Sequence, residues 1–181
     1  MYFIGGIVES PSNIILIGMP GSGKSTVGAI LAKITSRRFI DTDVLIQTEQ
    51  GRPLQVIVNH DGYMALRRIE ERILLRLHLD NHVIATGGSA IYSRKAMQHL
   101  GSQGVIVFLN VDLETLKSRV SDYNKRGLAK RTNQSVDDVF LERFALYNRY
   151  ADVIIDSSNL THAEVCARII SVLQLKFDAL S

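Results

Sequence analysis

Residues 18–26, GMPGSGKST, combine the types and spacing that chemistry on a phosphate group requires. They fit G-x-x-x-x-G-K-[ST] at every fixed position, which is typical of a phosphate-binding loop. Its glycines let successive backbone N–H groups turn inward around phosphate oxygens, and the positive end of the following helix points to the same place. Lys24 supplies a charge for the outer phosphates, and the Ser25 hydroxyl is placed to bind magnesium. The loop therefore predicts a nucleotide site with Mg²⁺.

The residues on either side of this loop form the elements that must position it. An apolar run over residues 14–17 leads into the loop like a buried strand, and apolar residues recur at helical spacing from Val27 to Ile34. A glycine-rich turn that opens an ordinary helix is the alternative interpretation. The strand before and the helix after favour the phosphate loop.

A pair of carboxylates, Asp41 and Asp43, follows the next short apolar segment. In an open parallel sheet, ligands bind beyond the carboxyl ends of the strands, where this pair is expected. One carboxylate could hold magnesium through water, and the other could accept a proton or orient a substrate hydroxyl. The alternative for Asp43 is an N-cap of a helix over residues 44–50.

Two arginines and a glycine pair have both a structural and a functional interpretation. Arg67 has Glu70 at i+3 and Glu71 at i+4, so surface ion pairs could account for it, and Arg143 could be a surface charge. Residues 87–88, Gly-Gly, end a third apolar run and either form a turn or let a ligand touch the backbone.

The segment 121–134 has few apolar residues and carries several cations, among them Arg126. A solvated charged loop is one interpretation. A closing lid is the other, because a cationic lid expels water and brings an arginine onto the transferring phosphate.

Five strand-like runs alternate with helical stretches, and each connection is long enough for a parallel crossover. We therefore predict an α/β fold, a three-layer α/β/α sandwich with a five-stranded parallel sheet of the P-loop NTPase type and a lid insertion. Residues 1–181 are expected to form one domain, with an N-terminal extension over residues 1–12 and the lid over residues 121–135. Four helix starts have capping residues: Ser93, Asp112, Ser135 with Asp138, and Thr161 with Glu164.

The composition is that of an ordinary globular protein, with 46% hydrophobic and 22% charged residues. The net charge of +3 suits an anionic small-molecule substrate, and the lack of an aromatic and basic platform argues against nucleic acid. A single cysteine, Cys166, excludes an intrachain disulfide and favours a cytoplasmic location. No run is long enough to predict a membrane span, and we expect a monomer.

The motifs together resemble the shikimate kinase family, a branch of the nucleoside-monophosphate-kinase-like P-loop fold. The resemblance runs from about residue 14 to residue 173. The motifs that carry it are the phosphate loop, Asp41-Thr42-Asp43, the segment 66–70 (LRRIE), Gly87-Gly88, Arg126, and Arg143 before Tyr147.

The resemblance implies ATP-dependent phosphorylation of the 3-hydroxyl of shikimate, a step of aromatic amino acid biosynthesis, with ATP and Mg²⁺. Asp43 would contact the hydroxyls and help to activate the acceptor, with Lys24 and Arg126 as the other catalytic residues. The implied residues fall into three groups: for ATP, Gly21, Ser22, Gly23, Lys24, Ser25, Thr26, Arg119 and Arg126; for shikimate, Asp43, Arg67, Gly87, Gly88 and Arg143; for magnesium, Ser25 and Asp41.

The chain departs from the family pattern at two places. The family commonly has a third glycine where Ser89 stands, and a proline where Gly127 stands in the lid. Both departures concern the choice of acceptor more than ATP binding. A kinase for another hydroxy acid such as gluconate, or a nucleotide-binding regulatory module without catalysis, are therefore the alternative functions.

Overall fold

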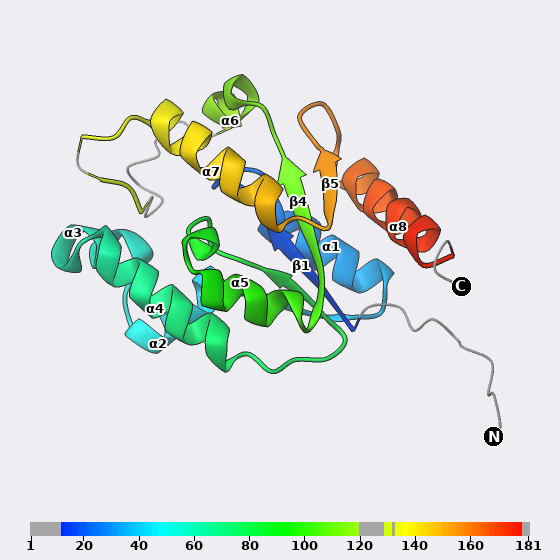
Figure 1. Cartoon of the computed structure of the whole chain (residues 1–181), viewed down its shortest axis with the longest axis horizontal. Helices are drawn as coiled ribbons and strands as arrows, with labels where there is room; N and C mark the ends of the chain where they lie inside the picture. The colour runs from blue at the N-terminus through cyan, green and yellow to red at the C-terminus, as the bar shows by residue number, and fades with distance from the viewer. Residues whose placement is uncertain (1–11, 120–128, 132, 179–181) are drawn as a thin grey trace.

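The computed structural model describes residues 12–119, 129–131 and 133–178. Its strands form one parallel sheet in the order β2-β3-β1-β4-β5, of which β1, β4 and β5 are labelled in Figure 1. The strands are β1 (Asn13–Ile17), β2 (Arg38–Asp41), β3 (His82–Ala85), β4 (Gly104–Asn110) and β5 (Val153–Asp156). The predicted five-stranded parallel sheet is confirmed.

The strands alternate with helices, as the sequence pattern predicted. The helices are α1 (Lys24–Ile34), α2 (Thr42–Gln50), α3 (Leu54–Asp61), α4 (Tyr63–Arg76), the 3₁₀ turn η1 (Ala90–Tyr92), α5 (Arg94–Gly101), α6 (Leu113–Arg119), α7 (Val136–Tyr150) and α8 (His162–Asp178). The four predicted caps are present: Asp112 accepts from the Thr115 amide, Ser93 caps α5, and two capping boxes open α7 and α8.

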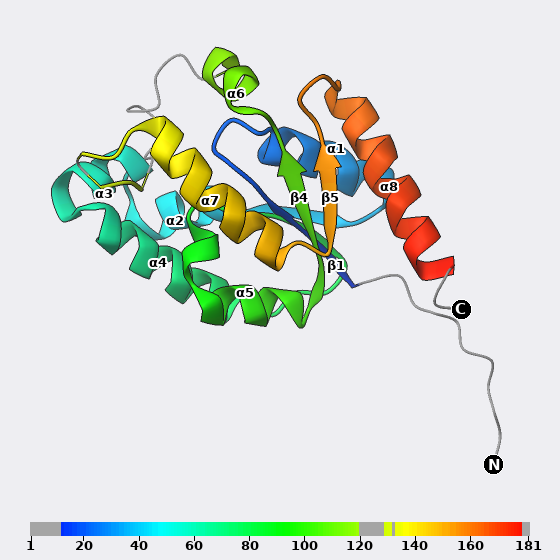
Figure 2. The ribbon, with the colours of Figure 1, turned by 45° about the horizontal axis from the view of Figure 1, so that its top comes forward.

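Helices cover both faces of the sheet, which makes the predicted three layers. One core joins α1 and α8 to the sheet, and the other joins α4, α5 and α7 to the opposite face (Figure 2). Because both faces are covered, β1 is buried at every position, which explains the unbroken apolar run over residues 14–17, and the buried Asn13 side chain is hydrogen-bonded. A third, smaller cluster joins α2, α3 and α4 with Ala129.

The order of the strands decides where a ligand can bind. The chain leaves β1 through α1 for the edge strand β2, returns to β3 beside β1, and then crosses to β4 on the other side of β1. Such a reversal of direction opens a crevice beyond the carboxyl ends of the central strands. The loop over residues 18–26 leaves β1 at this point.

None of the described helices is long and apolar enough to cross a membrane. The predicted extension lies outside the described residues apart from Ser12, and so do Arg126 and Gly127 of the predicted lid.

Candidate active site

The backbone of the loop between β1 and α1 has the conformation that a phosphate cradle needs. Gly21 and Gly23 have φ angles of 88° and 95°, in the left-handed region that favours glycine. Gly23 is the N-cap of α1 and no side chain caps this helix. The N–H groups of its first turn are therefore left for an anion, as they are wherever a helix start binds phosphate.

Lys24 lies inside the loop rather than in solvent. It is 8% exposed, and its Nζ donates to the carbonyl oxygens of Gly18 at 2.7 Å and Met19 at 2.9 Å. Burial lowers the Lys24 pKa to about 8, although the nearby carboxylates of Asp43 and Asp41 oppose this shift. The ammonium is thus already fixed and desolvated where it would meet a phosphate.

The remaining loop residues divide into two groups. Ser25 and Thr26 are exposed and line the cavity described below. Ser22 is buried, its backbone N–H donates to the Met19 carbonyl, and its hydroxyl has no partner among the described residues. Ser22 therefore points away from the cavity, unlike the other predicted nucleotide-binding residues of the loop.

The two carboxylates after β2 have different surroundings. Asp41 caps α2, because its Oδ1 accepts from the Asp43 amide at 2.9 Å. The interpretation of Asp43 as the N-cap is therefore wrong, since the helix begins at Thr42, two residues earlier than expected. Asp43 lines the cavity, and burial raises its pKa to about 6 against the opposing effect of Lys24.

A cavity of about 870 Å³ joins these groups at the carboxyl edge of the sheet. The predicted site residues that line it are Gly21, Gly23, Lys24, Ser25, Thr26, Asp43, Gly87, Gly88, Arg119 and Arg143. Asp41 and Arg67 are described but do not line it, and Arg126 lies outside the described residues. The cavity is large enough for two ligands, a nucleotide and a small acceptor.

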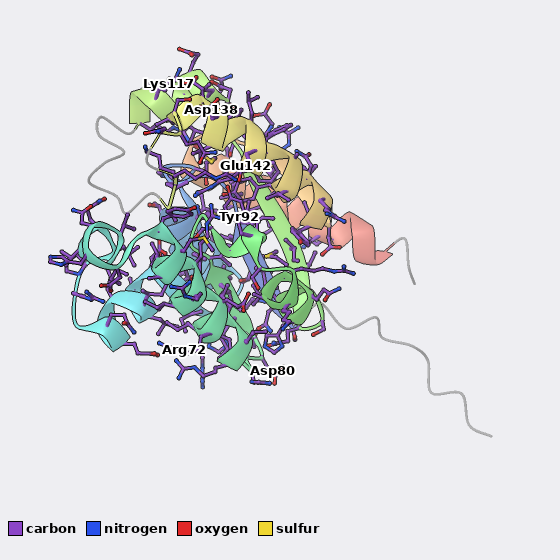
Figure 3. The ribbon with its side chains drawn as sticks, turned by 60° about the vertical axis from the view of Figure 1, so that its left-hand side comes forward. Arg72, Asp80, Tyr92, Lys117, Asp138 and Glu142 are labelled. Carbon is purple, nitrogen blue, oxygen red and sulfur yellow. The ribbon has the colours of Figure 1, made fainter. Side chains whose placement is uncertain are left out.

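The two arginines converge on one carbonyl oxygen. The Nη2 atoms of Arg143 and Arg67 both donate to the Ala129 carbonyl, at 2.9 and 3.3 Å. Arg143 is 1% exposed, so the surface-charge interpretation is wrong for it. Among the described residues Arg67 makes no ion pair with Glu70 or Glu71. The Arg67 guanidinium lies instead 3.5 Å from the centre of the Tyr92 ring (Tyr92 is labelled in Figure 3).

The two glycines after β3 are required by close approach and not by an unusual φ. A Cβ on Gly87 would overlap Glu70 Oε1 and lie 2.6 Å from Asp43 Oδ1. A Cβ on Gly88 would lie 2.8 Å from Pro20 and 2.9 Å from Arg143 Nη1. These glycines therefore let two carboxylates, an arginine and the phosphate loop come together around the backbone.

Glu70 is a site residue that the sequence interpretation missed. It is 2% exposed and lines the cavity, and burial together with the Asp43 charge raises its pKa to about 7. One signal was available, because Glu70 lies between Leu66 and Ile73 on the buried face of α4. A carboxylate at an apolar position of a helix points to a partner or a function.

The end of the cavity beside Arg119 was also only partly predicted. The Arg119 guanidinium donates to the carbonyls of Ser157 and Ser158, at 3.3 and 3.0 Å. Residues 160–162 line the same end, and the His162 ring lies 3.5 Å from the position a Cβ on Gly23 would take. His162 had no recognisable motif, and only the packing of α8 against the loop brings it here.

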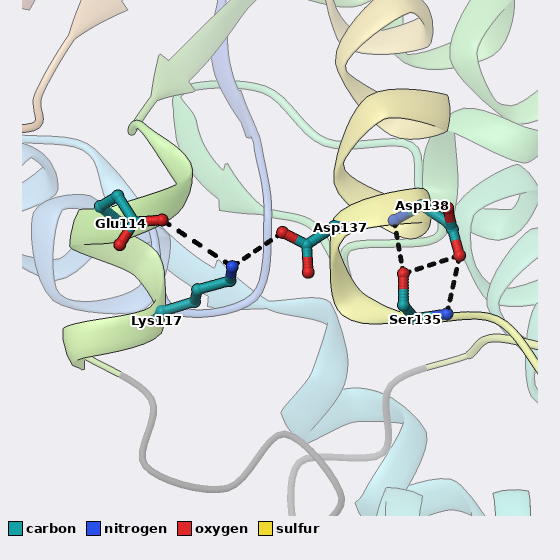
Figure 4. Close-up of polar contacts among 5 residues, drawn as sticks. All are labelled: Glu114, Lys117, Ser135, Asp137 and Asp138. Carbon is teal, nitrogen blue, oxygen red and sulfur yellow. Dashed lines mark hydrogen bonds and ion pairs between the residues drawn. The ribbon is translucent and has the colours of Figure 1, made fainter.

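The two helices that flank the predicted lid are tied to each other. Lys117 of α6 donates to Asp137 of α7 at 2.7 Å and lies 3.8 Å from Glu114 (Figure 4). Next to it, Ser135 and Asp138 form the capping box that opens α7. The start of α7 is thus fixed, and Arg143 lies two turns further along this helix.

Comparison with known proteins gives the family. A family model described as shikimate kinase matches residues 20–174. The chain belongs to the shikimate kinase family. Relatives within it include shikimate kinase 2 of Enterobacter sp. (strain 638), 32% identical over 167 residues that make up 90% of this chain and 95% of the relative. The shikimate kinase of Nitrosococcus oceani is 37% identical over 146 residues, 79% of this chain and 77% of the relative.

Solved structures of shikimate kinases have the same fold. The enzyme from Acinetobacter baumannii in complex with shikimate matches with a TM-score of 0.85 and 29% identity, over 93% of this chain and 96% of that one. The enzyme from Aquifex aeolicus matches with a TM-score of 0.76 and 31% identity, over 93% and 98%. Shikimate kinases use ATP and Mg²⁺, which agrees with the loop geometry.

Proposed function

We propose that this chain transfers the γ-phosphoryl group of ATP to the 3-hydroxyl of shikimate, giving shikimate 3-phosphate and ADP. The observation that carries the proposal is that Lys24, Asp43 and Arg143, from three different elements, line one cavity. Phosphoryl transfer needs mainly positioning and charge stabilisation, and this arrangement supplies both.

The donor half of the site would bind ATP through the loop. Backbone N–H groups of the glycine-rich turn and of the first turn of α1 would surround the phosphates, with Lys24 on the outer ones. Arg119, held by two carbonyls, would face the adenine. Arg126 is proposed for the transferring phosphate from the family motif alone.

The acceptor half would bind the hydroxy acid. Arg67 and Arg143 already share a carbonyl oxygen as acceptor, and their remaining N–H groups suit a carboxylate, for which two guanidinium groups are better than lysine. The Gly87 N–H donates to the Thr42 hydroxyl at 3.0 Å. The Gly88 N–H would therefore be the backbone donor to a ligand. Asp43 would bind the vicinal hydroxyls.

Asp43 has the properties of the group that receives the hydroxyl proton. With its pKa raised to about 6, the carboxylate is mostly ionised at neutral pH and more basic than an exposed aspartate. Lys24 lies close enough to stabilise its negative charge. A hydroxyl that donates to Asp43 would lie in the same cavity as the loop that would hold the phosphates.

The residues present fit a magnesium ion held together with ATP. Ser25 is exposed to the cavity at the start of α1, whereas Asp41 stands at the end of β2, outside the cavity lining, and would hold the ion through water. Among the described residues no group of three or more His, Cys, Asp or Glu could hold a metal by itself. Mg²⁺ usually keeps several waters and binds through one or two protein ligands together with substrate phosphates. When bound, Mg²⁺ neutralises charge on the phosphate oxygens.

An ADP-release assay across a panel of hydroxy acids tests this proposal. We expect Mg²⁺-dependent turnover with ATP and shikimate and little with gluconate or quinate. Turnover of another acid without turnover of shikimate would reject the acceptor, and Mg·ATP binding without any turnover would favour a regulatory module. A monomer in the cytoplasm that binds no nucleic acid remains part of the proposal.

A further inference from the structure

Ser89 stands where the family commonly has glycine, and its hydroxyl has a definite partner. The residue is 7% exposed, lines the cavity, and is the N-cap of the turn η1. Its Oγ donates to Oε2 of Glu70 on α4. The extra hydroxyl is thus used inside the protein, on a carboxylate that also lines the acceptor half of the cavity.

The Glu70 carboxyl is held in a narrow space. Its other oxygen, Oε1, is buried and has no hydrogen-bond partner among the described residues. That oxygen lies so near the Gly87 backbone that a Cβ there would overlap it, with Asp43 Oδ1 close to the same point. Ser89 is therefore the one described residue that hydrogen-bonds to this carboxyl, and its bond is the largest of the local influences that favour the ionised form.

Four charged groups from four helices meet around this point. Glu70 of α4 is faced by Asp43 of α2, Lys24 of α1 and Arg143 of α7, with the Ser89 hydroxyl beside it. Burial and the Asp43 charge favour the neutral form of Glu70 and raise its pKa to about 7, whereas Ser89, Arg143 and Lys24 favour the ionised form. The charge of Glu70 is thus finely balanced near neutral pH.

We propose that Ser89 is a positioning residue that acts through Glu70: its hydroxyl favours the ionised carboxylate and so sets the charge of the pocket that an anionic acid enters. An ionised Glu70 neutralises one of the two positive charges that face it, those of Lys24 and Arg143. A protonated Glu70 leaves the net charge of the pocket one unit more positive. Affinity for an anionic acid should therefore be higher below the Glu70 transition and fall as the pH rises through it. This effect on acid binding rests on the proposed function.

The direct test is the titration of Glu70 in the ligand-free protein, followed by NMR of ¹³C-labelled glutamate carboxyls and assigned with Glu70→Gln. A hydrogen bond to a charged group is worth about one pKa unit, so Ser89→Ala should move the midpoint upward by about one pH unit. Ser89→Thr keeps the hydroxyl and should leave the midpoint within a few tenths. An unmoved midpoint in Ser89→Ala would overturn the proposal.

Calorimetric titration with shikimate between pH 5.5 and 9 measures how the charge of Glu70 affects the binding of the acid. The pH at which the shikimate Kd begins to rise should move upward by about one unit in Ser89→Ala and in Ser89→Gly. In the Glu70→Gln background, Ser89→Ala should leave the pH dependence unchanged, and a shift that persists there would reject action through Glu70. If shikimate does not bind at all, the proposed function fails, while the NMR titration still decides the role of Ser89.

Ser93→Ala is the matched control. Ser93 lies at the other end of the same turn and caps α5 by accepting from the Ala96 amide at 3.1 Å. Loss of the Ser93 hydroxyl should lower the melting temperature by about as much as Ser89→Ala does. It should not move the pH midpoint of the Glu70 titration. A shift of that midpoint in Ser93→Ala would mean that loosening of the turn, and not the Ser89 hydroxyl, controls Glu70.

Discussion

The donor and acceptor halves of the cavity are built in different ways. The donor half is mostly one continuous loop, in which glycine φ angles and a buried lysine bonded to its own loop carbonyls make the geometry. The acceptor half consists of single side chains from α2, α4 and α7 around the Gly87-Gly88 backbone. The first half depends on local backbone structure, and the second on how distant helices pack.

The largest effect is expected in the donor half. Lys24→Met removes the fixed charge beside the phosphates and should lower kcat about 10³-fold, as the loss of a preorganised group that stabilises transition-state charge does. Lys33→Met, at the exposed end of the same helix, should leave kcat within twofold. Steady-state kinetics with ATP and shikimate measures both, and a decrease of less than tenfold in Lys24→Met would contradict the role of the loop.

Stability against pH is the next effect, and it belongs to the acceptor half. Because the Glu70 pKa is raised from 4.5 to about 7 in the folded protein, its contribution to stability is present below pH 4.5 and is lost as the pH rises to about 7. Glu70→Gln should lack this loss, so that it gains about 3 kcal/mol relative to the unmodified chain between pH 4.5 and pH 8.

Urea unfolding at the two pH values measures the difference. Glu71→Gln, the adjacent position on α4, should follow the unmodified chain. Parallel stability curves for the Glu70→Gln variant and the unmodified chain would show that Glu70 ionises in the folded protein as it does in water.

Arg67→Ala should affect the acid and not the nucleotide. Loss of one of two guanidinium groups should raise the KM for shikimate roughly 30-fold, while the KM for ATP stays within twofold. Arg68→Ala, exposed at the next position, is the control and should change neither. If the affinity for ATP fell instead, Arg67 would belong to the donor half.

The smallest effects compare the helix caps at the two ends of the cavity. Ser135→Ala removes the cap of α7, which carries Arg143, and Thr161→Ala removes the cap of α8 beside the nucleotide end. Each should cost about 1 kcal/mol of stability in thermal unfolding. We expect a severalfold rise in the KM for shikimate in the first variant and for ATP in the second. The reverse result would contradict the division of the cavity into a donor and an acceptor half.

Much of this protein could be predicted from short sequence patterns. The strand before Gly18, the helix after Gly23, and the capping boxes at Ser135 and Thr161 all depend on interactions between residues a few positions apart. At Asp43, the pattern of neighbouring residues does not fix the first residue of the helix. The helix start was placed near the correct residue, but Asp41 and Asp43 compete for the cap, and only the backbone geometry decides for Asp41.

Glu70 and His162 show what such patterns could not reveal. Glu70 was interpreted as a surface partner of Arg67 and as the last residue of the family segment 66–70, although it is buried among the charged groups of three other helices. His162 belongs to no motif and reaches the cavity because α8 packs beside the loop. The Ala129 carbonyl that binds both arginines carries no side-chain signal at all.

The sequence alone is enough to predict the phosphate loop and the alternation of strands and helices, because glycine conformation, capping and apolar periodicity act over a few residues. It also indicated the family through the order of its motifs. The tertiary structure was needed to show that Glu70 lies beside Asp43, that Ser89 donates to Glu70, and that Arg67 and Arg143 donate to the same carbonyl oxygen. Burial and pairing of charges depend on which distant helices pack together, and a pattern of neighbouring residues does not contain that information.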